Sequence, residues 1–291
     1  MIYDISHKTL YRYSAPVSQS HHIMHMSPRA FERQVVLRHS LLIEPAPTSR
    51  IEAADYFGNP TSRLCIEDEH SELVIHARST IKVAARPLVD LDDSQDWQHL
   101  APGLADARAP LDLQVLQFTW PSRHTMPTPE IIDYASASLQ PGQPVLAAAW
   151  DLTRRMFKDF TFDSSATDIS TPISTVLKQR RGVCQDFSHL ALACLRAARI
   201  PARYVSGYLL TRPPAGQQKL RGADASHAWI SVWAPETGWV DFDPTNGSMP
   251  QTEHISIAFG RDYDDVSPIS GVLLGGGRHT VSVAVDVAER T

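Results

Sequence analysis

Residues 181–198 read RGVCQDFSHLALACLRAA and decide how the second half of the chain folds. The apolar positions repeat at intervals of three and four residues, which predicts a helix with one buried face. These positions are Phe187, Leu190, Ala191, Cys194, Leu195 and Ala198. Cys184 falls at the helix start, just after Gly182, where free backbone N–H groups and the helix dipole favour a thiolate. A small buried residue on the apolar stripe is the alternative interpretation of this cysteine.

Alternating polar and apolar residues follow this helix and predict strands at 202–210, 225–233 and 239–243. A second helix with a broad apolar face is predicted over 144–158, upstream of Cys184. Helices followed by an antiparallel sheet predict an α+β core.

The turn at 234–238 predicts a hairpin in which Trp233 lies near Trp239. In that register Trp229 is opposite Asp243. A slip by one residue would move the aspartate to the other face of the sheet, so the register can be tested in the structure.

A thiolate nucleophile needs a base within hydrogen-bond reach and a group that orients the base. In the predicted register His227 and Asp243 are diagonal neighbours, about 7–8 Å apart at the backbone, which an imidazole and a carboxylate can span. Asp241 shares their face but lies farther from His227. Cys184, His227 and Asp243 are therefore the candidate catalytic residues. We expect Trp229 and Asp241, on the same face, to line the substrate cleft.

The first part of the chain has a period of two, clearest from Leu73 to Val83. This pattern predicts a β-sandwich-like N-terminal domain over 1–86. Acidic residues and prolines fill 87–127, which we interpret as a linker with at most one short helix. Residues 128–291 would form the catalytic core together with the C-terminal strands.

Composition excludes several classes of protein. The 291 residues include 27 basic and 32 acidic side chains, a net charge of −5, so nothing indicates binding to nucleic acid or to an anionic membrane. No apolar run approaches the ~20 residues that span a bilayer. The three cysteines, Cys65, Cys184 and Cys194, form no CxxC pair, and no nucleotide-binding motif is present. We expect no metal, no cofactor and a reducing, cytoplasmic location.

Three segments together resemble the core motifs of bacterial transglutaminase-like proteins: GVCQDF at 182–187, SHAW at 226–229 and GWVDFDPTNG at 238–247. The N-terminal strands and residues 260–271 resemble the flanking parts of the same group. The resemblance implies a papain-like α+β core in which Cys184, His227 and Asp243 act together. It supports Asp243 over Asp241, because Asp243 is the aspartate before Pro-Thr.

The resemblance also implies acyl transfer through a thioester on a peptide or protein substrate, at a peptide bond or a glutamine side chain. The thioester would pass to water or to an amine, since the group includes cross-linkers, cysteine peptidases and inactive members. One oxyanion donor would be the Cys184 backbone N–H, and the other a group near residues 160–162. An arylamine-type acetyltransferase and a catalytically silent binding or scaffold protein are the alternatives.

Overall fold

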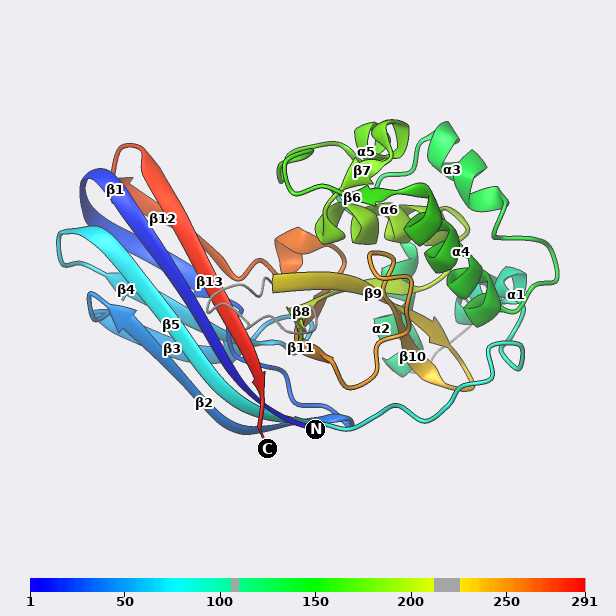
Figure 1. Cartoon of the computed structure of the whole chain (residues 1–291), viewed down its shortest axis with the longest axis horizontal. Coiled ribbons are helices and arrows are strands. Elements are labelled where there is room, and N and C mark those ends of the chain that lie inside the picture. The colour runs from blue at the N-terminus through cyan, green and yellow to red at the C-terminus, as the bar shows by residue number, and fades with distance from the viewer. Residues whose placement is uncertain (106–109, 212–225, 291) are drawn as a thin grey trace, which may run out of the picture.

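One long strand, β1 (Ile2–Met24), organises the N-terminal sheet in the computed structural model, which describes residues 1–105, 110–211 and 226–290. The first half of β1 pairs with two strands and its second half pairs with two others, all antiparallel (Figure 1). The partners of the first half are β5 (His70–Val83) and β13 (His279–Glu289), and those of the second half are β4 (Pro60–Ile66) and β12 (Ile269–Gly275). The outer strands are β2 (Gln34–Glu44), beside β5, and β3 (Ser49–Ala54), beside β4.

The alternation predicted in β5 is confirmed. Leu73, Ile75, Ala77, Ile81 and Val83 are all buried, while the residues between them are more exposed. Leu73, Ile75 and Ala77 join one apolar cluster with residues from β1, β2 and β4. The N-terminal region is all-β and the core is α+β, as the sequence predicts, but the N-terminal strands form one seven-stranded sheet rather than the two sheets of a sandwich.

The last two strands differ from the expectation that they belong with the core. β12 and β13 pair with β1, and the Arg290 N–H donates to the Ile2 carbonyl at 2.8 Å, so the two chain ends lie side by side (Figure 1). Alternation within 280–287 predicts a strand but does not name its neighbour. The open edge of β1 supplies it, because pairing there satisfies the backbone of both strands.

The segment predicted as a linker is more ordered than its composition indicates. It contains α1 (Trp97–Ala105), α2 (Pro110–Leu116) and the 3-10 turn η1 (Gln117–Thr119), with residues 106–109 outside the described part. Although this segment is acidic and rich in proline, four of its apolar residues are buried in the structure. These are Leu100, Leu104, Val115 and Phe118.

The core is built on a four-stranded antiparallel sheet with the order β10-β9-β8-β11. Its strands are β8 (Ala202–Leu209), β9 (Ser226–Ala234), β10 (Gly238–Phe242) and β11 (His254–Gly260). The three predicted strands are confirmed to within a residue, apart from Ala225, which is outside the described residues. Sequence reasoning did not predict β11. In β9 and β10, Trp233 pairs with Trp239 and Ser231 with Asp241, which confirms the predicted register.

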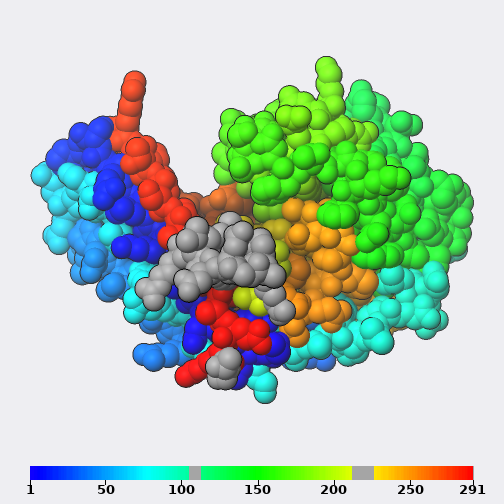
Figure 2. Space-filling view, viewed as in Figure 1, coloured from blue at the N-terminus to red at the C-terminus, as the bar shows by residue number. Residues whose placement is uncertain are grey.

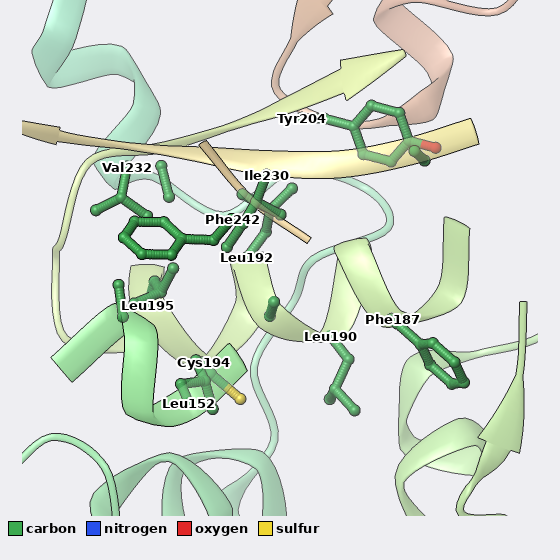
Figure 3. Packing of buried hydrophobic residues seen from close by; sticks show 14 of the residues in the cluster. Leu152, Phe187, Leu190, Leu192, Cys194, Leu195, Tyr204, Ile230, Val232 and Phe242 are labelled. Atoms are coloured by element: carbon green, nitrogen blue, oxygen red, sulfur yellow. The ribbon is translucent and has the colours of Figure 1, made fainter. Parts of the chain in front are cut away.

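Helices cover one face of this sheet. They are α3 (Pro129–Ser136), α4 (Val145–Asp159), α5 (Ile173–Gln179) and α6 (Cys184–Ala197). The central helix α6 packs Leu192 and Leu195 beneath Ile230, Val232 and Phe242 of the sheet, while Leu190 points away from the sheet (Figure 3). Short parallel strands β6 (Thr161–Phe162) and β7 (Arg181–Gly182) precede α6, and a 3-10 turn, η2 (Tyr263–Asp265), follows β11. Among the described residues, no helix has the length and apolar character needed to cross a bilayer.

The N-terminal part covers the opposite face of the core sheet. Phe31 packs against Val205, Trp229 and Phe259. The Gln34 side-chain amide donates to the Ser256 carbonyl at 2.6 Å and accepts from the Ser256 N–H at 2.9 Å. Asn59 makes the same pair of bonds to Phe259, at 2.7 and 2.9 Å. These two side-chain amides satisfy backbone groups along the outer edge of β11. The molecular surface is hollowed between the N-terminal strands and the helices (Figure 2).

Candidate active site

Cys184 is the first residue of α6, and the local structure fixes its position. β6 lies beside β7, and the Asp163 N–H donates to the Gly182 carbonyl at 2.9 Å. The Asp186 carboxylate accepts the Val183 N–H at 2.8 Å, which satisfies one free donor at the helix start. A Cβ on Gly182 would lie 2.6 Å from this carboxylate, so only glycine fits. The sulfur is thus held, half-buried, at the helix N-terminus.

His227 is the second residue of β9, whose beginning faces the N-terminal sheet (Figure 1). Its Nε2 donates to Asp243 Oδ2 at 2.7 Å, and its side chain is 9% exposed. The Cys184 side chain lies close enough to the ring to raise the pKa of His227. Since Nε2 faces Asp243, Nδ1 is the nitrogen left for the sulfur. The structure therefore brings together all three residues that the sequence singled out.

Asp243 follows β10 directly and is fully buried. Oδ1 accepts the backbone N–H groups of Thr245 and Asn246, at 2.9 and 3.1 Å. Oδ2 accepts from His227, from the Asn246 amide at 2.7 Å and from His254 at 2.9 Å. Burial alone would raise the pKa of Asp243, but the bonds from the two histidines hold it well below its ordinary value. The carboxylate is ionised, and its position is fixed from several sides.

This carboxylate changes the charge state of His227. Burial lowers the pKa of a histidine, but here the bond to Asp243 and the nearby Cys184 side chain outweigh burial and raise the pKa of His227 to about 10. The ring is therefore an imidazolium at neutral pH. A buried cation lies between a sulfur and a carboxylate, the arrangement that nucleophilic cysteine chemistry uses.

His254, the first residue of β11, belongs to the site and was missed by sequence reasoning. Its ring is 8% exposed, packs against the Trp229 indole with centroids 5.0 Å apart, and leaves Nδ1 without a hydrogen-bond partner. The alternating run HISIAFG at 254–260 predicts a strand that begins with a histidine. That signal could have found the residue, although nothing in the sequence pairs β11 with β8.

The ligand atoms of His227, Asp243 and His254 lie within 4.8 Å of one another, close enough for one cation. Hydrogen bonding already accounts for this spacing. Nε2 of His227, Nε2 of His254 and the Asn246 amide all donate hydrogen bonds to Oδ2 of Asp243. A cation at this place would instead need the lone pairs of these ring nitrogens. Nothing in the cluster calls for a metal, and metal-independent chemistry stays a prediction.

Trp229 does not line a substrate cleft, which corrects our expectation for that residue, whereas Asp241 lines a cavity that is separate from Cys184. Trp229 is fully buried between the rings of His227 and His254, and Asp241 is buried beside Arg33, whose Nη2 donates to Oδ2 at 3.2 Å. Their parity was predicted correctly. The error arose because sequence parity does not reveal that the N-terminal domain covers this face of the sheet.

Comparisons with known proteins identify the family of both parts of the chain. Residues 3–82 match the bacterial transglutaminase-like N-terminal region, and residues 133–244 match the transglutaminase-like superfamily. An uncharacterized protein of Mycobacterium tuberculosis is 38% identical, over 98% of this chain and 92% of its own length. A protein-glutamine gamma-glutamyltransferase of Pseudomonas aeruginosa is 36% identical over 93 residues, which are 32% of this chain and 14% of that enzyme.

Among solved structures, a candidate cysteine protease from Cytophaga hutchinsonii has the same fold. It superposes with a TM-score of 0.76 at 22% identity, over 99% of this chain and 90% of that one. Both parts of the fold, the motif positions and the relatives along the whole length lead to one assignment. The chain belongs to the transglutaminase-like superfamily and carries the bacterial transglutaminase-like N-terminal region before its core.

Proposed function

We propose that the chain is a cysteine acyltransferase or cysteine peptidase in which Cys184, His227 and Asp243 act as one unit. The observation that carries the proposal is the buried His227 ring, which is held by the Asp243 carboxylate at 2.7 Å and lies beside Cys184 at the start of α6. A structural cysteine would not need an ionised carboxylate to orient the ring beside it. The relatives support a transglutaminase-like reaction over the arylamine-type acetyltransferase, because the match extends to the N-terminal region.

In the proposed reaction the Cys184 proton resides on His227, and the thiolate attacks a carboxamide or peptide carbonyl. The tetrahedral oxyanion accepts the Cys184 backbone N–H. The C–N bond then breaks, and the amine leaves with the proton that His227 held. A thioester remains on the sulfur. Water or an acceptor amine then attacks this thioester, gives its proton to His227 and releases the cysteine.

A second oxyanion donor is proposed on β6. The N–H groups of Thr161 and Asp163 donate to the carbonyls of Arg180 and Gly182, both at 2.9 Å. The Phe162 N–H lies between these two donors and takes no part in the pairing with β7, which leaves it available as a donor. Phe162 is paired with Gly182, two residues before Cys184. This assignment refines the expectation of a donor near residues 160–162.

The substrate class is proposed as a peptide or protein with a glutamine side chain or a peptide bond. The test incubates the full chain with glutamine-containing peptides, with and without hydroxylamine or a fluorescent primary amine. Intact-mass measurement should show an acyl group on Cys184, ammonia or amine release, and transfer to the added amine where an amine is the acceptor.

Cys184→Ala should abolish the acyl adduct and lower turnover by a factor of about 10⁴ or more. Cys65→Ala is the matched control, because Cys65 is also partly exposed but lies in the N-terminal sheet. Burial raises the pKa of Cys194 to about 12, so Cys194 should resist alkylation while Cys184 reacts. Full turnover by Cys184→Ala, or equal slow labelling of all three thiols, would favour the silent binding protein instead.

We also propose a reducing, cytoplasmic location. All three cysteines are free thiols in the structure, and the proposed chemistry requires Cys184 to stay reduced. Reaction of the protein in intact cells with a membrane-permeable thiol reagent, but not with an impermeable one, would support this location.

A further inference from the structure

A cavity separate from the candidate active site lies on the face of the core sheet that the N-terminal part covers. Its volume is about 690 Å³, within the range of small-molecule sites. The cavity is lined by the segments around Arg29 and Arg86 and by the side chains of Arg203, Trp239 and Asp241. Cys184, His227 and Asp243 are absent from its walls, so it is separate from the proposed catalytic site.

Arg203 is the central cation of this cavity. Its guanidinium lies 3.8 Å from the Phe259 ring centroid and 4.2 Å from that of Trp239. The two aromatic rings occupy its faces, and Nε is buried without a hydrogen-bond partner. Burial lowers the pKa of Arg203, which reflects the cost of holding its charge there. The edge of the guanidinium thus offers an unused donor.

Arg86 is a second cation of this cavity with an unpartnered donor. Its Nη1 is also buried without a hydrogen-bond partner, and burial lowers the pKa of Arg86 as well. Arg33 has the Asp241 carboxylate at 3.2 Å. Arg29 also lines the cavity, so four guanidinium groups share one buried carboxylate, Asp241, among the lining residues.

The other acidic side chains are at the mouth of the cavity. Glu32, Asp90, Asp93 and Glu236 line it but are solvent-exposed. Water screens such charges strongly, so they compensate buried cations poorly. They also oppose the entry of a multiply charged anion. A ligand with one negative charge fits both the interior and the rim.

We propose that this cavity binds a small organic ligand through a single carboxylate held by Arg86 and Arg203. A planar carboxylate matches the fork of guanidinium donors, and small side-chain rotations would bring the unpartnered Nε of Arg203 and Nη1 of Arg86 onto it. The edges of Trp239 and Phe259 leave an apolar wall for the body of the ligand. The inference goes beyond the proposed catalytic function and does not depend on it.

Titration calorimetry on the full chain tests the proposal, with butyrate and benzoate as probes and butyramide and benzamide as uncharged matches at equal ionic strength. The acids should bind and the amides should not. Arg86→Gln should weaken binding by a factor of about ten or more, the value of a charge-assisted hydrogen bond. Arg63→Gln, an exposed arginine of the N-terminal sheet, should bind as the unmodified chain does.

A carboxylate could also bind at Cys184 as a reaction product, so the titration is repeated after alkylation of Cys184. Binding that survives alkylation belongs to the arginine cavity. A second variant covers the case in which Arg86→Gln does not fold: Asp241→Asn removes the competing carboxylate and should tighten binding. Absence of binding by both acids, equal affinity of acids and amides, or loss of binding on alkylation would each overturn the proposal.

Discussion

The two faces of the core sheet differ in the kind of side chain that they bury. The face under α6 is apolar, with Leu192, Ile230 and Val232 almost completely buried (Figure 3). The face under the N-terminal domain is equally hidden but carries polar and charged groups. Asp243 and Arg203 both lie on this side, and Arg203 is in the same row of the sheet as Ser231 and Asp241, two residues before Asp243. The comparison teaches that the side of the sheet under α6 mainly stabilises the fold, whereas the side under the N-terminal domain carries the groups suited to chemistry.

The polar face itself has two kinds of site. The Asp243 carboxylate accepts five hydrogen bonds, and it orients two imidazole rings. Around Asp241, two residues earlier in the chain, guanidinium donors outnumber acceptors. A carboxylate held by many donors can keep a precise geometry for catalysis, whereas guanidinium groups without an acceptor are suited to take up a ligand.

The sharpest test of this division is Asp243→Asn. The variant should lose the ionised partner of His227 and reduce kcat/KM by about 10³-fold or more, since the ring loses its orientation and its compensating charge. Steady-state kinetics on the substrate found by acyl trapping measures it. Asp241→Asn is the matched change two residues away and should cost at least a hundredfold less. Equal losses in the two variants would remove the distinction between the sites.

The apolar face should respond in stability instead. Leu192→Ala opens a cavity beneath the sheet and should lower the free energy of unfolding by about 2–5 kcal/mol. Urea unfolding followed by tryptophan fluorescence measures the change. The turnover of the folded fraction should stay within a few-fold of the unmodified chain. A larger loss of turnover at full folding would mean that α6 packing also sets the catalytic geometry.

The titration of His227 sharpens the electrostatic part of the comparison. Its pKa is raised to about 10 in the folded chain, above the ordinary value of about 6.5. The stabilisation from this ion pair is therefore complete below about pH 6.5 and is lost as the pH rises through about 10. In Asp243→Asn the pKa of His227 should fall by at least about 2 units, or about 3 kcal/mol.

Imidazole resonances followed by NMR against pH report this change directly, with Asp241→Asn as the control. A His227 ring that titrates near its ordinary value in the unmodified chain would contradict the proposed charge state.

The smallest expected effect is at His254, which acts as a positioning residue through Asp243. His254→Ala removes one donor to Oδ2 and should reduce kcat by about tenfold with little change in KM. His254→Gln retains a donor and should recover part of the loss. In an Asp243→Asn background the His254 change should have no further effect. Additive losses would indicate that His254 acts elsewhere.

Sequence reasoning alone identified much of the site. The helix beginning at Cys184 and the hairpin that places His227 near Asp243 follow from local periodicity, because period and turn position fix which side chains share a face. Alternation in β5 and in residues 280–287 likewise follows from local pattern. These features depend on residues close together in the chain.

Only the tertiary structure decided the rest. β12 and β13 join β1, β11 brings His254 to Asp243, and the N-terminal domain buries Trp229 and Asp241. Each of these contacts joins segments whose own patterns are compatible with several partners. The amino-acid pattern specifies which face of an element is apolar, whereas the choice of what covers that face depends on packing the whole chain.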